Sequence, residues 1–89
     1  MAMPFCIAVY DVNQKRVGKM LKLFRRYLTW VQNSVFEGDL TVSQLKQLQL
    51  EADALLQEDD GVVFYQFRDE RYVERIALGK DDVNRTRFL

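Results

Sequence analysis

The 89-residue sequence contains no histidine and only one cysteine, Cys6. Zinc sites are built mainly from cysteine and histidine, and the common catalytic triads need a histidine base. Both kinds of site are therefore excluded, and a lone cysteine forms no disulfide within the chain. Any metal bound here would be a hard cation held by oxygen atoms, such as Mg²⁺ or Mn²⁺.

Long apolar runs are also missing, since no stretch approaches the roughly 20 residues of a membrane-spanning helix. The start of the chain, MAMPFCIAVYD, lacks the basic residues and cleavage site of a signal peptide and has the composition of a strand. The sequence thus predicts a cytoplasmic protein with no membrane segment. Its length predicts a single domain over residues 1–89, with a small core that would gain stability from pairing.

The formal net charge is zero, but the charges are segregated. Residues 14–30 contain six basic and no acidic side chains, whereas residues 51–60 contain five acidic and no basic ones. A local basic face attracts a polyanion even in a neutral protein, because the local field decides. A solvated helix face is the alternative interpretation of such a stripe.

The apolar pattern predicts alternating strands and helices. Residues 5–12 form a continuous apolar run, typical of a central strand buried on both faces. Residues 14–28 follow a helical period after Asn13, a suitable N-cap. The predicted apolar face of this helix comprises Val17, Met20, Leu21, Phe24 and Leu28. The predicted basic stripe opposite comprises Lys15, Lys19, Lys22 and Arg26.

A hairpin and a second helix follow. Residues 29–32 and 35–40 favour strands, and Asn33-Ser34 suits the turn between them. A capping box at 41–44 begins a helix whose apolar face comprises Leu45, Leu48, Ala52, Leu55 and Leu56. The acidic run at 58–61 ends it, with Gly61 as the expected stop.

Two further strands are predicted, at 62–67 and at 72–78, before a polar tail at 80–89. The order βαββαβ plus a final strand predicts an α+β fold of the ferredoxin-like type. In that fold, both helices cover one face of an antiparallel sheet. The RNA-recognition fold has the same order, but SVFEGDL lacks the glycine- and aromatic-rich pattern that stacks bases.

Asp11 ends the first apolar strand and has two interpretations. It is either a turn residue that caps the basic helix, or a metal ligand or catalytic carboxylate held by a rigid strand end. One carboxylate is a poor site for a divalent cation. A twofold dimer whose strand ends meet at the axis would supply a second copy.

Several other polar and aromatic residues are candidates for a site. Trp30 and Phe36 favour packing over base stacking. Glu37 and Asp39 are candidate additional metal ligands, although acids beside Gly38 are more often simply exposed. Ser34 has no histidine to activate it and is interpreted as a turn residue.

Together, the strand end VYDV, the basic helix, the run VQNSVFEGDL and the capped second helix resemble a known family over nearly the whole chain. This is the family of the second core CRISPR-associated protein, the small subunit of the spacer-acquisition machinery. The resemblance implies a ferredoxin-like homodimer in which the last strand, here 72–78, completes the sheet of the partner. The tail at 80–89 is expected to be either frayed or docked on that partner.

The resemblance also implies an activity. It implies metal-dependent endonuclease cleavage of RNA or DNA, with Asp11 of both subunits holding Mg²⁺ or Mn²⁺. It further implies that the protein bridges two dimers of the integrase subunit during integration of new spacers. The helix residues that would contact the nucleic-acid backbone are Lys15, Arg16, Lys19 and Lys22.

Two alternatives to this activity stay open. One is a non-catalytic, dimeric DNA-bridging scaffold of the same complex, in which Asp11 is structural. The other is a toxin-like ribonuclease of the same fold that acts without an integrase.

Overall fold

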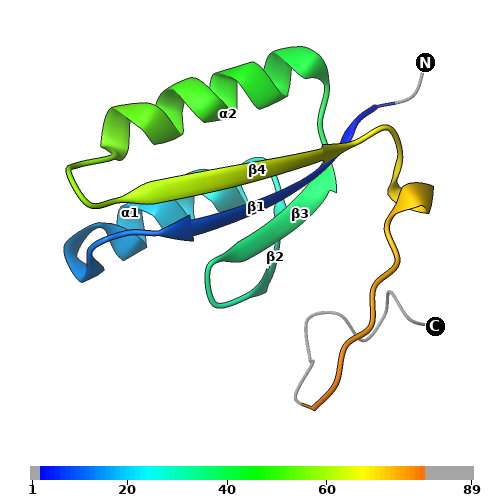
Figure 1. Cartoon of the computed structure of the whole chain (residues 1–89). Coiled ribbons are helices and arrows are strands. Elements are labelled where there is room, and N and C mark those ends of the chain that lie inside the picture. The colour runs from blue at the N-terminus through cyan, green and yellow to red at the C-terminus, as the bar shows by residue number, and fades with distance from the viewer. Residues whose placement is uncertain (1–2, 80–89) are drawn as a thin grey trace.

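The computed structural model describes residues 3–79, which form a four-stranded sheet covered by two helices (Figure 1). In chain order the elements are β1 (Phe5–Asp11), α1 (Gln14–Arg25), β2 (Thr29–Gln32), β3 (Val35–Asp39), α2 (Val42–Leu55), β4 (Gly61–Phe67) and the short 3₁₀ helix η1 (Glu70–Tyr72). The strand order is β2-β3-β1-β4, and all neighbouring strands are antiparallel. Both helices lie on the same face. The predicted βαββαβ order and the ferredoxin-like α+β fold are confirmed.

The central strand β1 pairs with β3 on one side and β4 on the other. Its side chains alternate between the two faces of the sheet. Cys6, Ala8 and Tyr10 are buried under the helices, whereas Ile7 and Val9 are only half-buried on the opposite face. The prediction of burial on both faces is therefore correct for the helix side and, on the opposite side of β1, for Phe5 alone. We call the opposite side the open face.

The core lies between the sheet and the two helices. Its buried residues are Cys6, Ala8, Tyr10, Met20, Leu23, Phe24, Leu28, Phe36, Leu40, Leu45, Leu48 and Ala52. In α1 the buried face is rotated toward Leu23, so Val17 lies at its margin and is 40% exposed. The prediction of Val17 in the core is wrong for this reason. No helix within residues 3–79 is long and apolar enough to cross a membrane.

The predicted capping box begins α2. The backbone N–H of Gln44 donates to the Thr41 hydroxyl, and the backbone N–H of Thr41 donates to the Gln44 side chain. The helix ends at Leu55, however, so the prediction that Gly61 stops it is wrong. The residues between form a turn in which Asp59 adopts a positive φ of 78°, and Gly61 begins β4. Acidic side chains that bond to nearby backbone compete with helix continuation in this way.

The predicted strand at 72–78 is not formed. Glu70–Tyr72 is the 3₁₀ helix η1, and residues 73–79 pair with no strand of the described chain. After β4 the chain turns away from the sheet edge and runs past the open face (Figure 1). Arg75 forms an ion pair there with Glu37 of β3. A strand needs an aligned neighbouring edge, and this path offers residues 73–79 none within their own chain.

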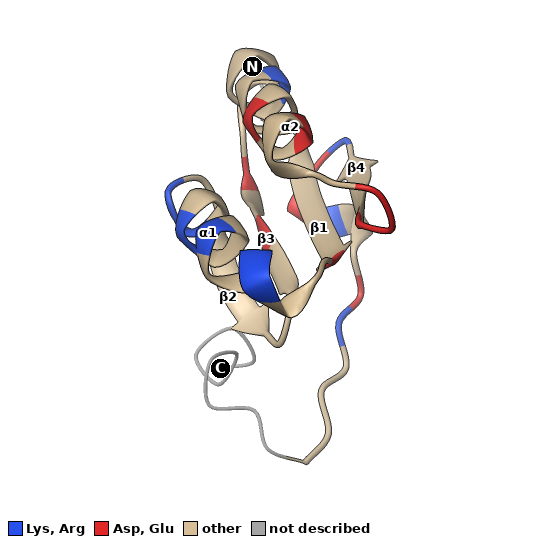
Figure 2. Ribbon diagram, turned by 90° about the vertical axis from the view of Figure 1, so that its left-hand side faces the viewer, with Lys and Arg blue, Asp and Glu red and all other residues tan. Residues whose placement is uncertain are grey.

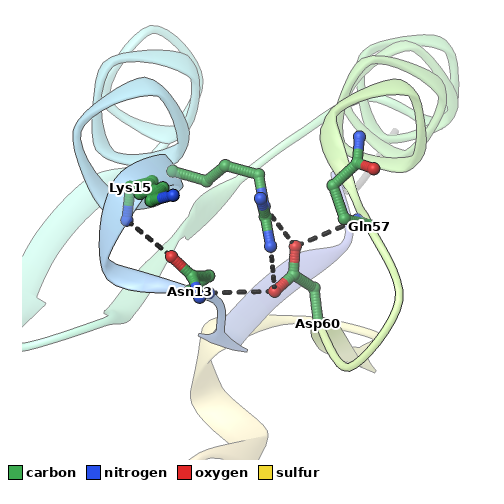
Figure 3. Close-up of polar contacts among 5 residues, drawn as sticks. Asn13, Lys15, Gln57 and Asp60 are labelled. Carbon is green, nitrogen blue, oxygen red and sulfur yellow. Dashed lines mark hydrogen bonds and ion pairs between the residues drawn. The ribbon is translucent and has the colours of Figure 1, made fainter.

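The carboxylate of Asp60 joins the loop before β4 to the start of α1 (Figure 3). It accepts hydrogen bonds from the backbone N–H groups of Asn13 and Gln57, both at 2.9 Å. Arg16 also donates to this carboxylate, from Nε at 2.5 Å and from Nη2 at 3.0 Å. The Asp60 side chain is only 1% exposed. The Arg16 guanidinium, followed by the two backbone donors, holds the pKa of Asp60 well below its usual range. We call these four residues the Asp60 cluster.

Two glycine substitutions should have opposite effects on stability. A Cβ at Gly38 would lie 3.3 Å from Cδ2 of the buried Leu28, whereas nothing lies within 4 Å of one at Gly18 in α1. We expect Gly38→Ala to lower the free energy of unfolding by about 1–3 kcal/mol. Gly18→Ala should raise it by about 0.5–1 kcal/mol. Urea unfolding at one fixed protein concentration measures both, and equal effects would contradict the close contact at Gly38.

The Asp60 cluster should make stability depend on acid. The folded pKa of Asp60 is depressed below the ordinary 3.8, so its contribution is complete above 3.8 and is lost as the pH falls toward the folded pKa. We expect Asp60→Asn to destabilise the protein at neutral pH and the difference from the native chain to shrink below pH 3.8. Unfolding by urea across this range measures it, with the exposed neighbour variant Asp59→Asn as the control. A difference that did not change with pH would contradict the cluster.

Candidate strand-end carboxylate and nucleic-acid interface

Asp11 is the last residue of β1, and its side chain is exposed where the central strand turns toward α1. Its backbone pairs with Gly61 at the start of β4. Because side chains alternate along a strand, Asp11 lies on the same face as Ile7 and Val9. The carboxylate is therefore presented on the open face of the sheet and not toward the helices.

Two other acids of the open face lie far from Asp11. The strand register places Glu37 opposite Ile7 and Asp39 opposite Phe5. At roughly 3.3 Å per residue, these positions are about 13 and 20 Å from Asp11 along β1. The expectation that Glu37 and Asp39 add ligands to a metal at Asp11 of the same chain is wrong. Within the part of the chain that the structure describes, no group of three or more acidic, cysteine or histidine side chains is placed to hold a metal.

Glu37 has a different role, because it is buried at 4% exposure and pairs with Arg75. A buried carboxylate is costly without a compensating charge, and Arg75 supplies one. Arg75 belongs to the segment 73–79 that follows η1. This segment and the residues Ile7 and Val35 of the sheet line one shallow cleft on the open face. The ion pair therefore holds the segment against the open face.

The predicted basic stripe is present on α1. Lys15, Lys19 and Lys22 are exposed and recur at helical spacing along one face. Figure 2 shows the basic residues on α1, whereas acidic residues occupy α2 and the loop that leads to β4. These three lysines form a row of cations suited to the phosphates of a nucleic acid.

Arg16 lies apart from this row. Its guanidinium is directed to Asp60, and its side chain is 23% exposed. Two of its donors are thus already used within the protein. The role of Arg16 in nucleic-acid binding stays a prediction, whereas its contact with Asp60 is a structural feature that the helical pattern alone did not indicate.

The basic row continues into a groove between the two helices. Its lining includes Lys19 and Lys22 from α1, Arg26 at the C-cap of that helix, and Glu51 from α2. Arg26 Nη1 lies 3.4 Å from Glu51 Oε1. The Tyr27 hydroxyl also donates to Glu51, which lowers the pKa of this carboxyl and raises that of Tyr27. Arg26 is therefore partly neutralised, and the positive charge is concentrated on the lysines.

The remaining candidates are packing or turn residues, with one exception. Phe36 is fully buried and stacks against Tyr10, which settles its place in the core. Ser34 lies in the β2–β3 turn, as predicted. Burial raises the pKa of the Cys6 thiol to about 11, so this cysteine is no nucleophile near neutral pH. Trp30 is the exception, since its ring on β2 is 40% exposed while its N–H donates to the Asn33 carbonyl.

Sequence reasoning missed the Asp60 cluster. The donors of this cluster lie 47, 44 and 3 residues from Asp60. No periodic pattern connects such positions. The only signal was the opposite charge of residues 14–30 and 51–60, which favours contacts between the two segments without saying which side chains meet.

Comparison with known proteins identifies the family. The model of the family described as CRISPR associated protein Cas2 matches residues 3–75. The CRISPR-associated endoribonuclease Cas2 of Dictyoglomus turgidum is 42% identical over 86 residues, covering 96% of this chain and 99% of the relative. The protein of the same name from Thermotoga maritima is 46% identical over 76 residues, covering 84% and 87%.

Solved structures agree with these matches. One described as a crystal structure of Cas2 has a TM-score of 0.85 at 40% identity, covering 91% of this chain and 92% of its own. Streptococcus pyogenes Cas2 has a TM-score of 0.69 at 29% identity, covering 82% and 99%. The sheet order, the strand-end Asp11 and these comparisons lead to one conclusion: the chain belongs to the Cas2 family of CRISPR-associated proteins.

Proposed function

We propose that the protein is a homodimeric, metal-dependent endonuclease of CRISPR adaptation that hydrolyses phosphodiester bonds in RNA or DNA. The observation that carries this proposal is the position of Asp11, exposed at the end of the central strand on the open face. The printed names of the relatives, which are endoribonucleases, support RNA as a substrate. The cytoplasmic location expected from the sequence stays a prediction.

The open face supports the homodimer. Val63 and Tyr65 of β4 are 50% and 53% exposed there, beside the half-buried Ile7 and Val9 of β1. An exposed apolar surface of this kind is typical of an interface. If two copies pack their open faces around a twofold axis, each contributes the same surface. The two Asp11 side chains then lie on the buried side of the pair, at the ends of two central strands.

A second Asp11 also makes the donor set suitable for a metal. One chain offers a single carboxylate, whereas two copies offer two, and Mg²⁺ is commonly bound by one or two carboxylates with waters and phosphate oxygens. The residues that would hold Mg²⁺ or Mn²⁺ are thus Asp11 of both subunits. When bound, the metal supplies polarisation of the scissile phosphate and a lower pKa for the attacking water.

The chain's own side chains then divide the remaining work. The Asp11 carboxylates would bind the metal or accept a hydrogen bond from the attacking water. Lys15, Lys19 and Lys22 contact phosphates of the backbone and orient the strand, and they do so without reading its sequence. Trp30, exposed on β2, is available to stack on an unpaired base.

A second candidate function is a dimeric scaffold that bridges DNA and the integrase subunit without cleaving. The exposed lysine row favours it, because phosphate contacts serve binding and cleavage equally. Family membership makes the toxin-like ribonuclease the least favoured of the three. Cleavage that depends on Asp11 separates the endonuclease from the scaffold.

The first prediction concerns Asp11. Asp11→Asn keeps the size of the side chain and removes its charge, so we expect cleavage to fall by about a hundredfold or more while nucleic-acid binding persists. Single-stranded RNA and duplex DNA are each incubated with Mg²⁺, Mn²⁺ or EDTA. Asp39→Asn, at the other end of the open face, is the matched control. Equal cutting by the native and Asp11→Asn proteins would exclude Asp11 from catalysis.

The second prediction concerns the lysine row. Replacing Lys15, Lys19 and Lys22 together by glutamine should weaken binding to a DNA duplex. The slope of log K against log salt should also become shallower by about 2–3, because up to three phosphate contacts are lost. Fluorescence anisotropy at several salt concentrations measures the slope. Lys46→Gln on α2 is the control with an equally exposed lysine, and an unchanged slope in the triple variant would place the nucleic acid elsewhere.

A further inference from the structure

The Asp60 carboxylate has no part in the chemistry described above, yet it is buried and accepts several hydrogen bonds. Four donor atoms from three residues reach it, and its side chain is 1% exposed. Charge-assisted bonds of this kind are stronger than neutral ones and fix direction as well as distance. Such an arrangement fixes the position of the backbone segments that donate to the carboxylate.

Part of the backbone that it touches lies next to Asp11 in the chain. Gly61, the residue after Asp60, is the ladder partner of Asp11 in β4. Asn13, two residues after Asp11, donates its backbone N–H to Asp60 at 2.9 Å. The chain is therefore held at Asp11 by the β4 ladder and, two residues later, by the Asp60 carboxylate, whose contact with Asn13 is drawn in Figure 3.

Arg16 and the backbone N–H of Gln57 also bond to the Asp60 carboxylate. Arg16 contacts both carboxylate oxygens, so it ties the first turn of α1 to the same point. The Gln57 N–H at 2.9 Å ties the start of the α2–β4 loop to it as well. Three segments that surround the strand end thus meet at one buried carboxylate, while the Asp11 carboxylate itself stays exposed.

We propose that Asp60 is a positioning residue that sets the direction of the Asp11 carboxylate through its bonds to Asn13, Gln57 and Arg16. This inference rests on the proposed function of Asp11 as the metal-holding or water-orienting group. A site shared by two subunits is sensitive to such positioning, because a shift at one strand end is repeated at the other. Misplacement by about 1 Å costs up to a hundredfold in rate.

The test uses Asp60→Asn in the full-length protein. Asparagine keeps one acceptor oxygen but loses the charge and cannot accept from both sides, so the Arg16 and backbone donors are no longer all satisfied. We expect kcat to fall about tenfold to a hundredfold while KM for RNA stays near the native value, because the lysine row is unchanged. Circular dichroism and gel filtration confirm the fold and the native assembly. Asp59→Asn, an exposed acid of the same loop, should leave both constants unchanged.

Non-additivity separates positioning from general destabilisation. If Asp60 acts through Asp11, the double variant Asp11→Asn/Asp60→Asn should be no slower than Asp11→Asn alone. Asp60→Glu, which keeps the charge, should recover part of the lost rate. A folded Asp60→Asn protein with native kcat would overturn the proposal, and so would full additivity of the two losses. If Asp60→Asn does not fold, Arg16→Gln removes the side-chain contacts alone and is measured in the same way.

A readout without substrate keeps this test apart from the proposed function. The ¹³C chemical shift of the Asp11 carboxyl and the broadening of nearby amide signals by Mn²⁺ are recorded for the native, Asp60→Asn and Asp59→Asn proteins. A change in Asp60→Asn alone is expected. If Asp11→Asn cleaves as well as the native protein, the proposed function fails, and these spectra still decide the positioning role. An unmoved Asp11 signal in Asp60→Asn would overturn that role whatever the activity.

Discussion

The placement of β1 in the middle of the sheet is the constraint on which the rest of the structure depends. Pairing with β3 and β4 on its two edges fixes which side chains face the helices. Tyr10 must then enter the core, and Asp11, one residue later, must lie on the other face. A slip of one residue would bury the acid and expose the tyrosine. The position of the candidate site is thus a direct result of strand register.

Charge separation in the sequence has two distinct results in the fold. Some of the basic side chains form ion pairs within the protein. Arg16 pairs with Asp60 of the acidic loop, and Arg26 pairs with Glu51 of α2. These contacts fasten α1 to the α2–β4 region. The remaining lysines of α1 stay exposed, which leaves a cationic surface on a protein of zero formal net charge. The basic side chains of this one helix thus divide between contacts within the protein and an exposed row that we propose for polyanion binding.

Local patterns predicted most of the fold, and long-range contacts account for the errors. The helical period, the capping box at Thr41 and the hairpin turn each depend on residues a few positions apart, so the sequence alone located these elements. The predicted fifth strand is not formed in the single chain, because a strand needs a neighbouring edge and residues 73–79 find none there. The helix end at Leu55 and the Asp60 cluster likewise depend on contacts that no local pattern indicates. The place of Asp11 at a strand end is visible in the sequence, whereas the contacts of Asp60 are not.

The most direct test of a site shared by two subunits is a subunit-mixing measurement. Native and Asp11→Asn chains are unfolded together, refolded at varied ratios and assayed for cleavage at constant total protein. If both Asp11 side chains hold one metal, a mixed dimer is impaired, and activity follows the square of the native fraction. Activity that falls linearly with the native fraction would mean that each subunit cleaves by itself, and it would contradict the shared site.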